Sequence, residues 1–307
     1  MTTTLTDATP PTSSPVTQED SDRLRQQAQG RSRLGSVAYH AFMVVVSLVV
    51  LYPAIWMVFS STKPHAEILG SVSPFSPNAS FDNYLTALQG IGGVSFWTFV
   101  WNSTFVAVVS VVATVASSAV TAYAFARIDF RGRGLWFAVM LGTLLLPFHV
   151  TMIPQYILFQ RLGLINTFTA LLIGNFLATS AFHVFLIVQF LRGLPRELDE
   201  AARIDGAGHL RVFTSIILPL LRPALITVAI FVFISTWNEF MGPLLYLKRP
   251  DLYTLPIALR LFVDQTTTSD YGAQVAMAVL ALIPVAIFFF VFQRYLIDGV
   301  ATQGLKG

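Results

Sequence analysis

The sequence contains no cysteine and has few charged residues. Without cysteine, a disulfide scaffold, a thiolate metal site and a cysteine nucleophile are all excluded. Charged residues make up 11% of the 307 residues, whereas a soluble domain carries roughly a quarter. A chain with so little charge cannot give two soluble domains a solvated surface.

Lysine is so scarce that a nucleotide-binding P-loop is excluded. A P-loop needs Gly-Lys followed by Ser or Thr around the phosphates. The lysines are Lys63, Lys248 and Lys306, and they follow Thr, Leu and Leu. Any ATP hydrolysis linked to this protein must therefore take place on another chain. The net charge of +3 also gives no reason to expect a nucleic-acid partner.

Apolar residues are abundant, with 54% of the chain hydrophobic and a mean hydropathy of +0.66. A helix needs about 20 mostly apolar residues to cross the hydrocarbon core of a bilayer. The pattern predicts an all-α polytopic membrane protein with six transmembrane helices. The predicted spans are 37–59, 97–126, 134–160, 162–191, 223–247 and 271–293.

The positions of the basic residues predict the orientation in the membrane. With a cytoplasmic N-terminus, fourteen of the 19 lysines and arginines fall in cytoplasmic segments. An excess of Lys and Arg is typical of cytoplasmic loops, so we expect both termini in the cytoplasm. The outer loops then contain Lys63, Arg161, Lys248, Arg249 and Arg260.

Composition divides the chain into four parts. Residues 1–33 are polar and are predicted to be disordered. Residues 34–94 are predicted to form the first transmembrane helix and an outer loop. The apolar run in this part is too long, and begins too far from the N-terminus, for a signal peptide. Residues 95–297 hold five further spans with a cytoplasmic loop at 192–219, and residues 298–307 form a cytoplasmic tail with little intrinsic order.

Two prolines interrupt the third predicted span, Pro147 and Pro154. Proline removes a backbone donor and kinks a helix, and the freed carbonyls must then face protein or a watery cavity. The kink is consistent either with tight packing or with the wall of a pathway.

The loop between the fourth and fifth spans predicts a short helix, a sharp turn and a second short helix. Pro195 suits the first turn of a helix, and the acidic residues after it favour the positive end of the helix dipole. Gly206 and Gly208 then allow a turn that residues with a Cβ resist.

This loop resembles the EAA loop of ABC importer permeases, which reads Glu-Ala-Ala, three residues, Gly, nine residues and Ile-x-Leu-Pro. Every position is filled, by Glu200, Ala201, Ala202, Gly206, Ile216, Leu218 and Pro219, with Asp205 before the glycine. The run from Trp237 to Phe240 and the ending from Gln293 to Gly307 are similar to the carbohydrate-uptake, MalG-like branch of the family. The resemblance extends from the first span to the end of the chain.

The resemblance implies a type I ABC importer permease fold in the bacterial cytoplasmic (inner) membrane, in contact with membrane lipid. It implies a MalF-like second permease, two ATPase subunits and an extracytoplasmic solute-binding protein as partners, with a sugar as substrate. ATP and Mg²⁺ are expected on the ATPases, so this chain is expected to bind no cofactor and not to be an enzyme. The loop residues named above are expected to couple to the ATPase.

Two other functions are kept as alternatives. Glycerol 3-phosphate and related polyol phosphates are possible substrates, since the same branch of the family handles them. A secondary transporter is a further alternative, but such carriers usually place charged residues inside their spans, and only Glu239 lies in one here. His40, His149 and His183 lack metal-ligand spacing, so no metal or catalytic site is predicted.

A sugar would be recognised by amide, carboxylate and aromatic side chains within the spans. The candidates for the substrate pathway are Gln155, Asn175, Trp237, Asn238 and Glu239. The alternative is that these side chains make hydrogen bonds between helices.

Overall fold

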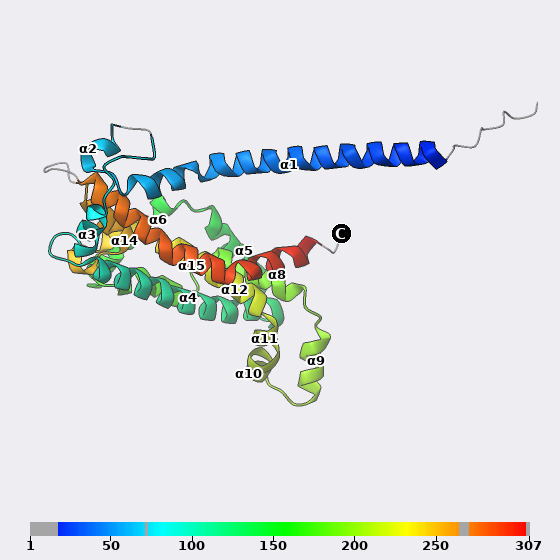
Figure 1. Ribbon diagram of the computed structural model, residues 1–307. Helices are drawn as coiled ribbons and strands as arrows, with labels where there is room; N and C mark the ends of the chain where they lie inside the picture. Colours follow the sequence, from blue (N-terminus) through cyan, green and yellow to red (C-terminus); the bar gives the residue numbers. More distant parts are fainter. Residues whose placement is uncertain (1–17, 71–72, 264–269, 305–307) are drawn as a thin grey trace, which may run out of the picture. The chain divides into compact units, whose positions relative to one another are not determined.

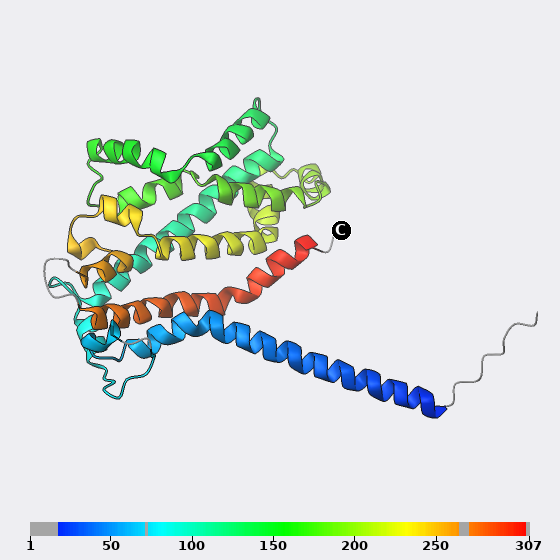
Figure 2. The same ribbon diagram turned by 90° about the horizontal axis from the view of Figure 1, so that it is seen from above.

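The computed structural model describes residues 18–70, 73–263 and 270–304 (Figures 1 and 2). Over these residues the chain is helical, and β-type pairing is confined to an isolated bridge between Ile91 and Val94. The chain forms two compact units, 1–56 and 57–307. The described part contains four helices able to cross a membrane, or six spans if each of two bent helix pairs counts as one. The predicted all-α, membrane-spanning fold is confirmed.

Helix α1 (Gln18–Ser60) carries the first predicted span. All its side chains between residues 35 and 54 are exposed, and most are apolar, as a lipid solvent requires. The disorder predicted for residues 1–33 is not seen at 18–33, which are helical, while residues 1–17 lie outside the described part. Gln, Arg, Ala and Leu favour helix, and extending an existing helix costs less than starting one.

The loop after α1, which is predicted to be an outer loop, contains two short helices, α2 (His65–Ile68) and α3 (Asp82–Gln89). The Asn83 side-chain amide on α3 ties this loop together, because it donates hydrogen bonds to the carbonyls of Ser61 and Lys63, at 2.8 and 2.7 Å. A tight turn then leads into the second span.

Helix α4 (Phe96–Arg127) is the second span and the centre of the larger unit. The Ser95 hydroxyl caps its start by accepting a hydrogen bond from the Trp97 backbone. Helices α7 (Thr169–Phe176) and α8 (Ala181–Arg192), which form the fourth span, pack against it. The numerous Ala and Ser residues of α4 allow this close approach.

The third span is broken, as its prolines predict. It consists of α5 (Arg133–Gly142), a 3₁₀ turn η1 (Thr143–Leu145) and α6 (Phe148–Arg161), with a bend of 102° between the two halves. The break falls at Pro147, whereas Pro154 lies inside α6.

The segment between the fourth and fifth spans consists of short helical pieces. Helix α9 (Glu197–Ile204) is followed by α10 (His209–Val212), a π-helical turn η2 (Phe213–Ile217) and α11 (Leu218–Leu220). The chain then bends by 74° into the fifth span.

Helix α12 (Arg222–Trp237) forms the fifth span and is shorter than the predicted 223–247. The helix stops because Glu239 turns back: its carboxylate accepts a hydrogen bond from the Gly242 backbone at 3.0 Å. This contact starts a separate short helix, α13 (Met241–Tyr246).

The remaining elements are a 3₁₀ turn η3 (Pro250–Leu252), α14 (Leu255–Leu261) and the last span, α15 (Tyr271–Gly304). Figure 2 shows α12 and α15 side by side. Contrary to the predicted low order of the tail at 298–307, α15 stays helical to Gly304, because it prolongs an established helix. Residues 305–307 lie outside the described part.

Two apolar cores lie at the two ends of α4. One joins its last turns to α8, to the segment after α8 and to the first half of α12. The other joins its first turns to α3, α14, α15 and the end of α12. Helix α4 therefore links a surface built around the 192–219 loop to a surface built around α3 and α14.

The turn before α4 gives a test of backbone geometry. Gly90 has φ +85°, and a Cβ there would lie 1.9 Å from the Val94 carbonyl oxygen. We expect Gly90→Ala to lower the free energy of unfolding by about 3 kcal/mol, since strain and a backbone clash combine. Gly93→Ala is the control: Gly93 also has positive φ, +77°, but open space around it, so about 1 kcal/mol is expected.

Thermal unfolding of the purified protein in detergent, followed by tryptophan fluorescence, measures both changes. Equal losses of stability in the two variants would contradict the clash at Gly90.

Candidate functional site

The EAA segment, residues 192–219, has the predicted order of helix, turn and helix. Figure 1 shows α9 and α10 together at one end of the larger unit. The first turn of α9 carries Glu197, Asp199 and Glu200. Their negative charge favours the positive end of the helix dipole.

The eight predicted residues of this segment occupy three kinds of position. Glu200, Ala201, Asp205, Gly206 and Pro219 are exposed, Ile216 and Leu218 are half-buried, and Ala202 is buried. Ala202 belongs to the apolar core that α4, α8 and α12 share. One face of the segment is thus packed and the other is open to a partner.

Gly206 makes the turn possible. It has φ +82°, and the carbonyls of Arg203 and Ala202 accept hydrogen bonds from the backbone N–H groups of Gly206 and Ala207, both at 2.9 Å. This is the Schellman arrangement, in which a residue in the left-handed region ends a helix. A Cβ at Gly206 would meet no atom within 4 Å, so the requirement for glycine comes from the backbone alone.

A buried ion pair fastens the segment to the last turn of α4. Arg127 Nε lies 3.0 Å from Asp199 Oδ2, and the two side chains are only 3% and 8% exposed. The Arg127 guanidinium also donates a hydrogen bond to the Leu194 carbonyl at 2.9 Å. Removing one partner of a buried ion pair leaves the other charge uncompensated, so the contact strongly favours this one arrangement.

Two weaker hydrogen bonds support the ion pair. The Arg196 guanidinium donates to the Ala126 carbonyl at 3.4 Å, and the Tyr123 hydroxyl donates to the His209 carbonyl at 3.3 Å. The end of α4 therefore contacts the segment before, within and after α9. Sequence reasoning did not single out these α4 residues, because nothing local in the sequence pairs them with a loop so far along the chain.

Two large apolar side chains flank the Gly206 turn and are almost fully exposed. Ile204 at the end of α9 is 86% exposed, and Leu210 on α10 is 76% exposed. An exposed apolar pair rimmed by polar residues is typical of a protein interface.

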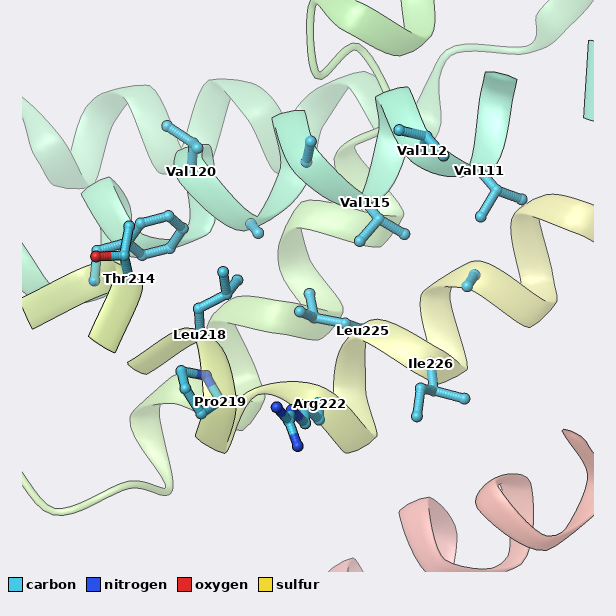
Figure 3. A pocket seen from close by; sticks show the side chains of 14 residues that line it. Val111, Val112, Val115, Val120, Thr214, Leu218, Pro219, Arg222, Leu225 and Ile226 are labelled. Atoms are coloured by element: carbon cyan, nitrogen blue, oxygen red, sulfur yellow. The ribbon is translucent and has the colours of Figure 1, made fainter. Parts of the chain in front are cut away.

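An apolar groove of about 750 Å³ runs beside the segment (Figure 3). Helix α4 forms one wall, and η2, α11 and α12 form the other. Val115 and Leu225 face each other across it, and Leu218 of the EAA motif lies in its wall. Arg222 is the one charged residue among the described residues of the lining.

A second, polar cavity of about 200 Å³ lies toward the other end of α4. Asn175 of α7 and Glu239, both predicted pathway residues, line it together. The Asn175 side-chain amide donates to the Ser110 hydroxyl at 2.8 Å, and the Asn175 backbone carbonyl accepts from the Ser117 hydroxyl at 2.7 Å. The cavity is lined by Ser103, Val106, Ser110, Leu171, Asn175, Ser235, Thr236, Glu239, Pro243 and Thr254.

The other predicted pathway residues lie elsewhere. Trp237 is buried in the core, where its ring stacks on Phe233 and its indole N–H donates to the Ala281 carbonyl at 3.2 Å. Trp237 and Asn238 line a separate space of about 210 Å³. Gln155 is half-buried on α6 and does not line the polar cavity.

Metal ligands are not clustered in the part of the chain that the structure describes. No group of three or more His, Asp or Glu side chains there could hold a metal ion.

Comparisons with known proteins agree with the geometry. Residues 115–302 match the family model of the binding-protein-dependent transport system inner membrane component. This range includes the whole EAA segment and most of the residues that line the groove and the polar cavity.

Several curated proteins are similar over most of their length. The arabinooligosaccharides transport system permease protein AraQ of Halalkalibacterium halodurans is 34% identical over 85% of this chain and 93% of that protein. The diacetylchitobiose uptake system permease protein NgcG of Streptomyces coelicolor is 33% identical over 92% of each chain. The trehalose/maltose transport system permease protein MalG of Thermococcus litoralis is 32% identical over 86% of this chain and 94% of that protein.

A solved structure has the same fold. A chain from the crystal structure of a bacterial ABC transporter that imports the acidic polysaccharide alginate matches with a TM-score of 0.74 and 26% identity. The match covers 86% of this chain and 97% of that one.

The buried ion pair gives a quantitative prediction. Asp199→Ala should lower the free energy of unfolding by about 3–5 kcal/mol, because Arg127 is left charged and buried. Asp129→Ala, which breaks the exposed pair that Arg133 makes at 2.6 Å, should cost less than about 1 kcal/mol. Thermal unfolding in detergent compares the two variants.

The double variant Arg127→Met with Asp199→Leu should recover much of the loss, since it removes both charges together. A stability of Asp199→Ala equal to that of Asp129→Ala would show that the pair carries little of the attachment.

Proposed function

The chain belongs to the family of binding-protein-dependent transport system inner membrane components, and from this premise we infer that it is the permease subunit of an ABC importer for neutral saccharides. The observation that carries the proposal is the EAA segment, which is exposed on one face and held to α4 by a buried ion pair on the other. A segment built in this way can receive force from a partner and pass it to a transmembrane helix.

The partner at this segment is an ATPase subunit. Ile204 and Leu210 offer it an exposed apolar contact, and Glu200 and Asp205 offer it charge. The sequence holds no Walker lysine, so ATP and Mg²⁺ bind to the ATPases, two of which complete the transporter. This division of labour makes the chain a transport subunit.

A second, MalF-like permease covers the free face of α4. Apolar side chains that recur at helical spacing remain exposed along it: Trp101, Phe105, Val108, Val112 and Val120. Helices in lipid associate through closely packed surfaces, and Ala116 on this face allows close approach. The translocation pathway then runs between the two permeases.

The substrate is assigned from the relatives and from charge. The relatives' names state arabinooligosaccharides, diacetylchitobiose, trehalose and maltose, all of which are saccharides. A polyol phosphate would favour cationic side chains on its route, and Arg249, one of the five basic residues on the outer side, is already paired with Asp251 at 2.5 Å. The substrates in the relatives' names favour a saccharide over glycerol 3-phosphate.

The orientation follows the distribution of basic residues. Both termini and the EAA segment are cytoplasmic, so the outer loops with α2, α3 and α14 face the extracytoplasmic solute-binding protein. The domain boundaries at residues 94 and 297 then separate an outer loop and a cytoplasmic tail from the permease core.

A glycine substitution tests the role of the EAA turn. Gly206→Val should lower ATP-driven saccharide uptake at least fivefold, because a β-branched residue at φ +82° is strained by about 1–3 kcal/mol and the turn must rearrange. Gly208→Val is the matched control, since Gly208 has φ −73° and ψ 166° and also has open space around it.

Uptake of radiolabelled saccharide into proteoliposomes and co-purification of the ATPase are the measurements. Normal uptake by Gly206→Val, or an equal loss in Gly208→Val, would contradict a role for the turn geometry in coupling.

A further inference from the structure

Among the described residues that line the polar cavity beside α4, many carry hydrogen-bonding groups and none carries a cationic side chain. Hydroxyls come from α4, from the end of α12 and from the start of α14, an amide comes from α7, and Glu239 supplies a carboxylate. Neither Lys, Arg nor His is among its lining residues. The cavity would therefore repel an anion and accommodate a neutral molecule rich in hydroxyl groups.

The Thr254 hydroxyl is the strongest sign that something binds there. Thr254 is 4% exposed and occupies the N-cap position of α14, yet its side chain makes no capping hydrogen bond. Its Oγ1 is buried and has no hydrogen-bond partner among the described residues. Nearly all buried polar atoms in native proteins are paired, so an unpaired hydroxyl that lines a cavity points to a missing partner.

Other lining groups also keep hydrogen-bonding capacity. Glu239 Oε1 accepts from the Gly242 backbone at 3.0 Å, and Oε2 has no donor among the described residues. The Asn175 amide donates to the Ser110 hydroxyl, which leaves the Asn175 Oδ1 and the Ser110 proton without a described partner. The cavity thus presents acceptors and donors together, as vicinal hydroxyl groups require.

One hydroxyl of the cavity is already used by the protein. The Ser103 hydroxyl accepts a hydrogen bond from the Leu255 backbone at 2.8 Å, which holds the start of α14 against α4. Thr254 lies beside this contact, so its position is fixed even though its own hydroxyl is unpaired.

We propose that this cavity is a binding subsite for a sugar ring, in which Thr254, Asn175, Ser110 and Glu239 recognise hydroxyl groups of the transported saccharide. The proposal rests on the proposed function and adds to it a contact site within this chain. At about 200 Å³ the cavity has room for one ring or part of one, with any further residues of a longer saccharide outside it.

Occupancy can be measured directly because the chain has no cysteine. A Thr236→Cys variant places one thiol in the cavity lining. It is assembled with both partner permease and ATPases, trapped with ATP and vanadate, and treated with a membrane-impermeant methanethiosulfonate reagent. The probes are maltose, trehalose, N,N′-diacetylchitobiose and arabinotriose, with glycerol 3-phosphate for comparison. Labelling is read by the mass of this chain, so cysteines of the partners do not interfere.

We expect the saccharide that the wild-type transporter takes up to slow the labelling at least threefold. Adding Thr254→Val should raise the half-protecting concentration about three- to tenfold, because one hydrogen bond is lost. Thr254→Ser keeps the hydroxyl and should restore protection. The control is Thr104→Val on α4, whose hydroxyl donates to the Val100 carbonyl and does not line the cavity. It should leave protection unchanged.

Three results would overturn the subsite. If the wild type takes up a saccharide that gives no protection, the cavity holds water only and the proposed function stands. If Thr254→Val and Thr104→Val shift protection equally, Thr254 has a structural role and again only the subsite fails. If the transporter takes up glycerol 3-phosphate and none of the saccharides, the proposed function fails and the subsite fails with it.

Discussion

The structure depends on one ion pair, between Arg127 at the end of α4 and Asp199 in α9. Burying both charges is costly, and the cost is offset only when they face each other with the Leu194 carbonyl as a third partner. A shift of α9 by one turn would leave two charges unpaired in an apolar core. The pair thus fixes the position of the whole segment between the fourth and fifth spans, including the face that is open to a partner.

Helix α4 connects this ion pair to contacts at the other end of the larger unit. At about 1.5 Å per residue, the distance from Arg127 to the Ser110 end of the polar cavity is roughly 25 Å. The far end of α4 is held as firmly, because the Asn102 amide donates to the carbonyls of Asp251 and Tyr253 at 2.8 and 3.0 Å. Helix α4 thus connects the EAA segment directly to the loop that contains Asp251 and Tyr253.

Features encoded by neighbouring residues could be predicted from the sequence, and features that join distant residues could not. The turn at Gly206 and the break at Pro147 are local features. The turn needs a residue with positive φ, which glycine adopts, and the break occurs because proline lacks a backbone N–H donor. The Arg127–Asp199 pair is invisible in the sequence, because each residue looks like an ordinary charge at a membrane surface. The position of Trp237 could not be predicted either: its indole N–H donates a hydrogen bond to the Ala281 carbonyl on α15, and its ring belongs to an apolar core. Asn175 and Glu239 do meet at one cavity, yet the unpaired Thr254 beside them could be found only from burial.

The contacts of α4 also set an order in time. The hydrogen bonds at the two ends of α4 join residues at different distances along the sequence. Leu194 follows Arg127 by 67 residues, whereas Asp251 follows Asn102 by 149 residues. At a synthesis rate of about 5–20 residues per second, the first partner is made roughly 3 to 13 s after Arg127, and the second roughly 7 to 30 s after Asn102. During the first interval Arg127 lacks both the Leu194 carbonyl and the Asp199 carboxylate that pair with it in the folded protein. The attachment of the EAA segment to the end of α4 can therefore form before the attachment of the start of α4 to the loop that contains Asp251.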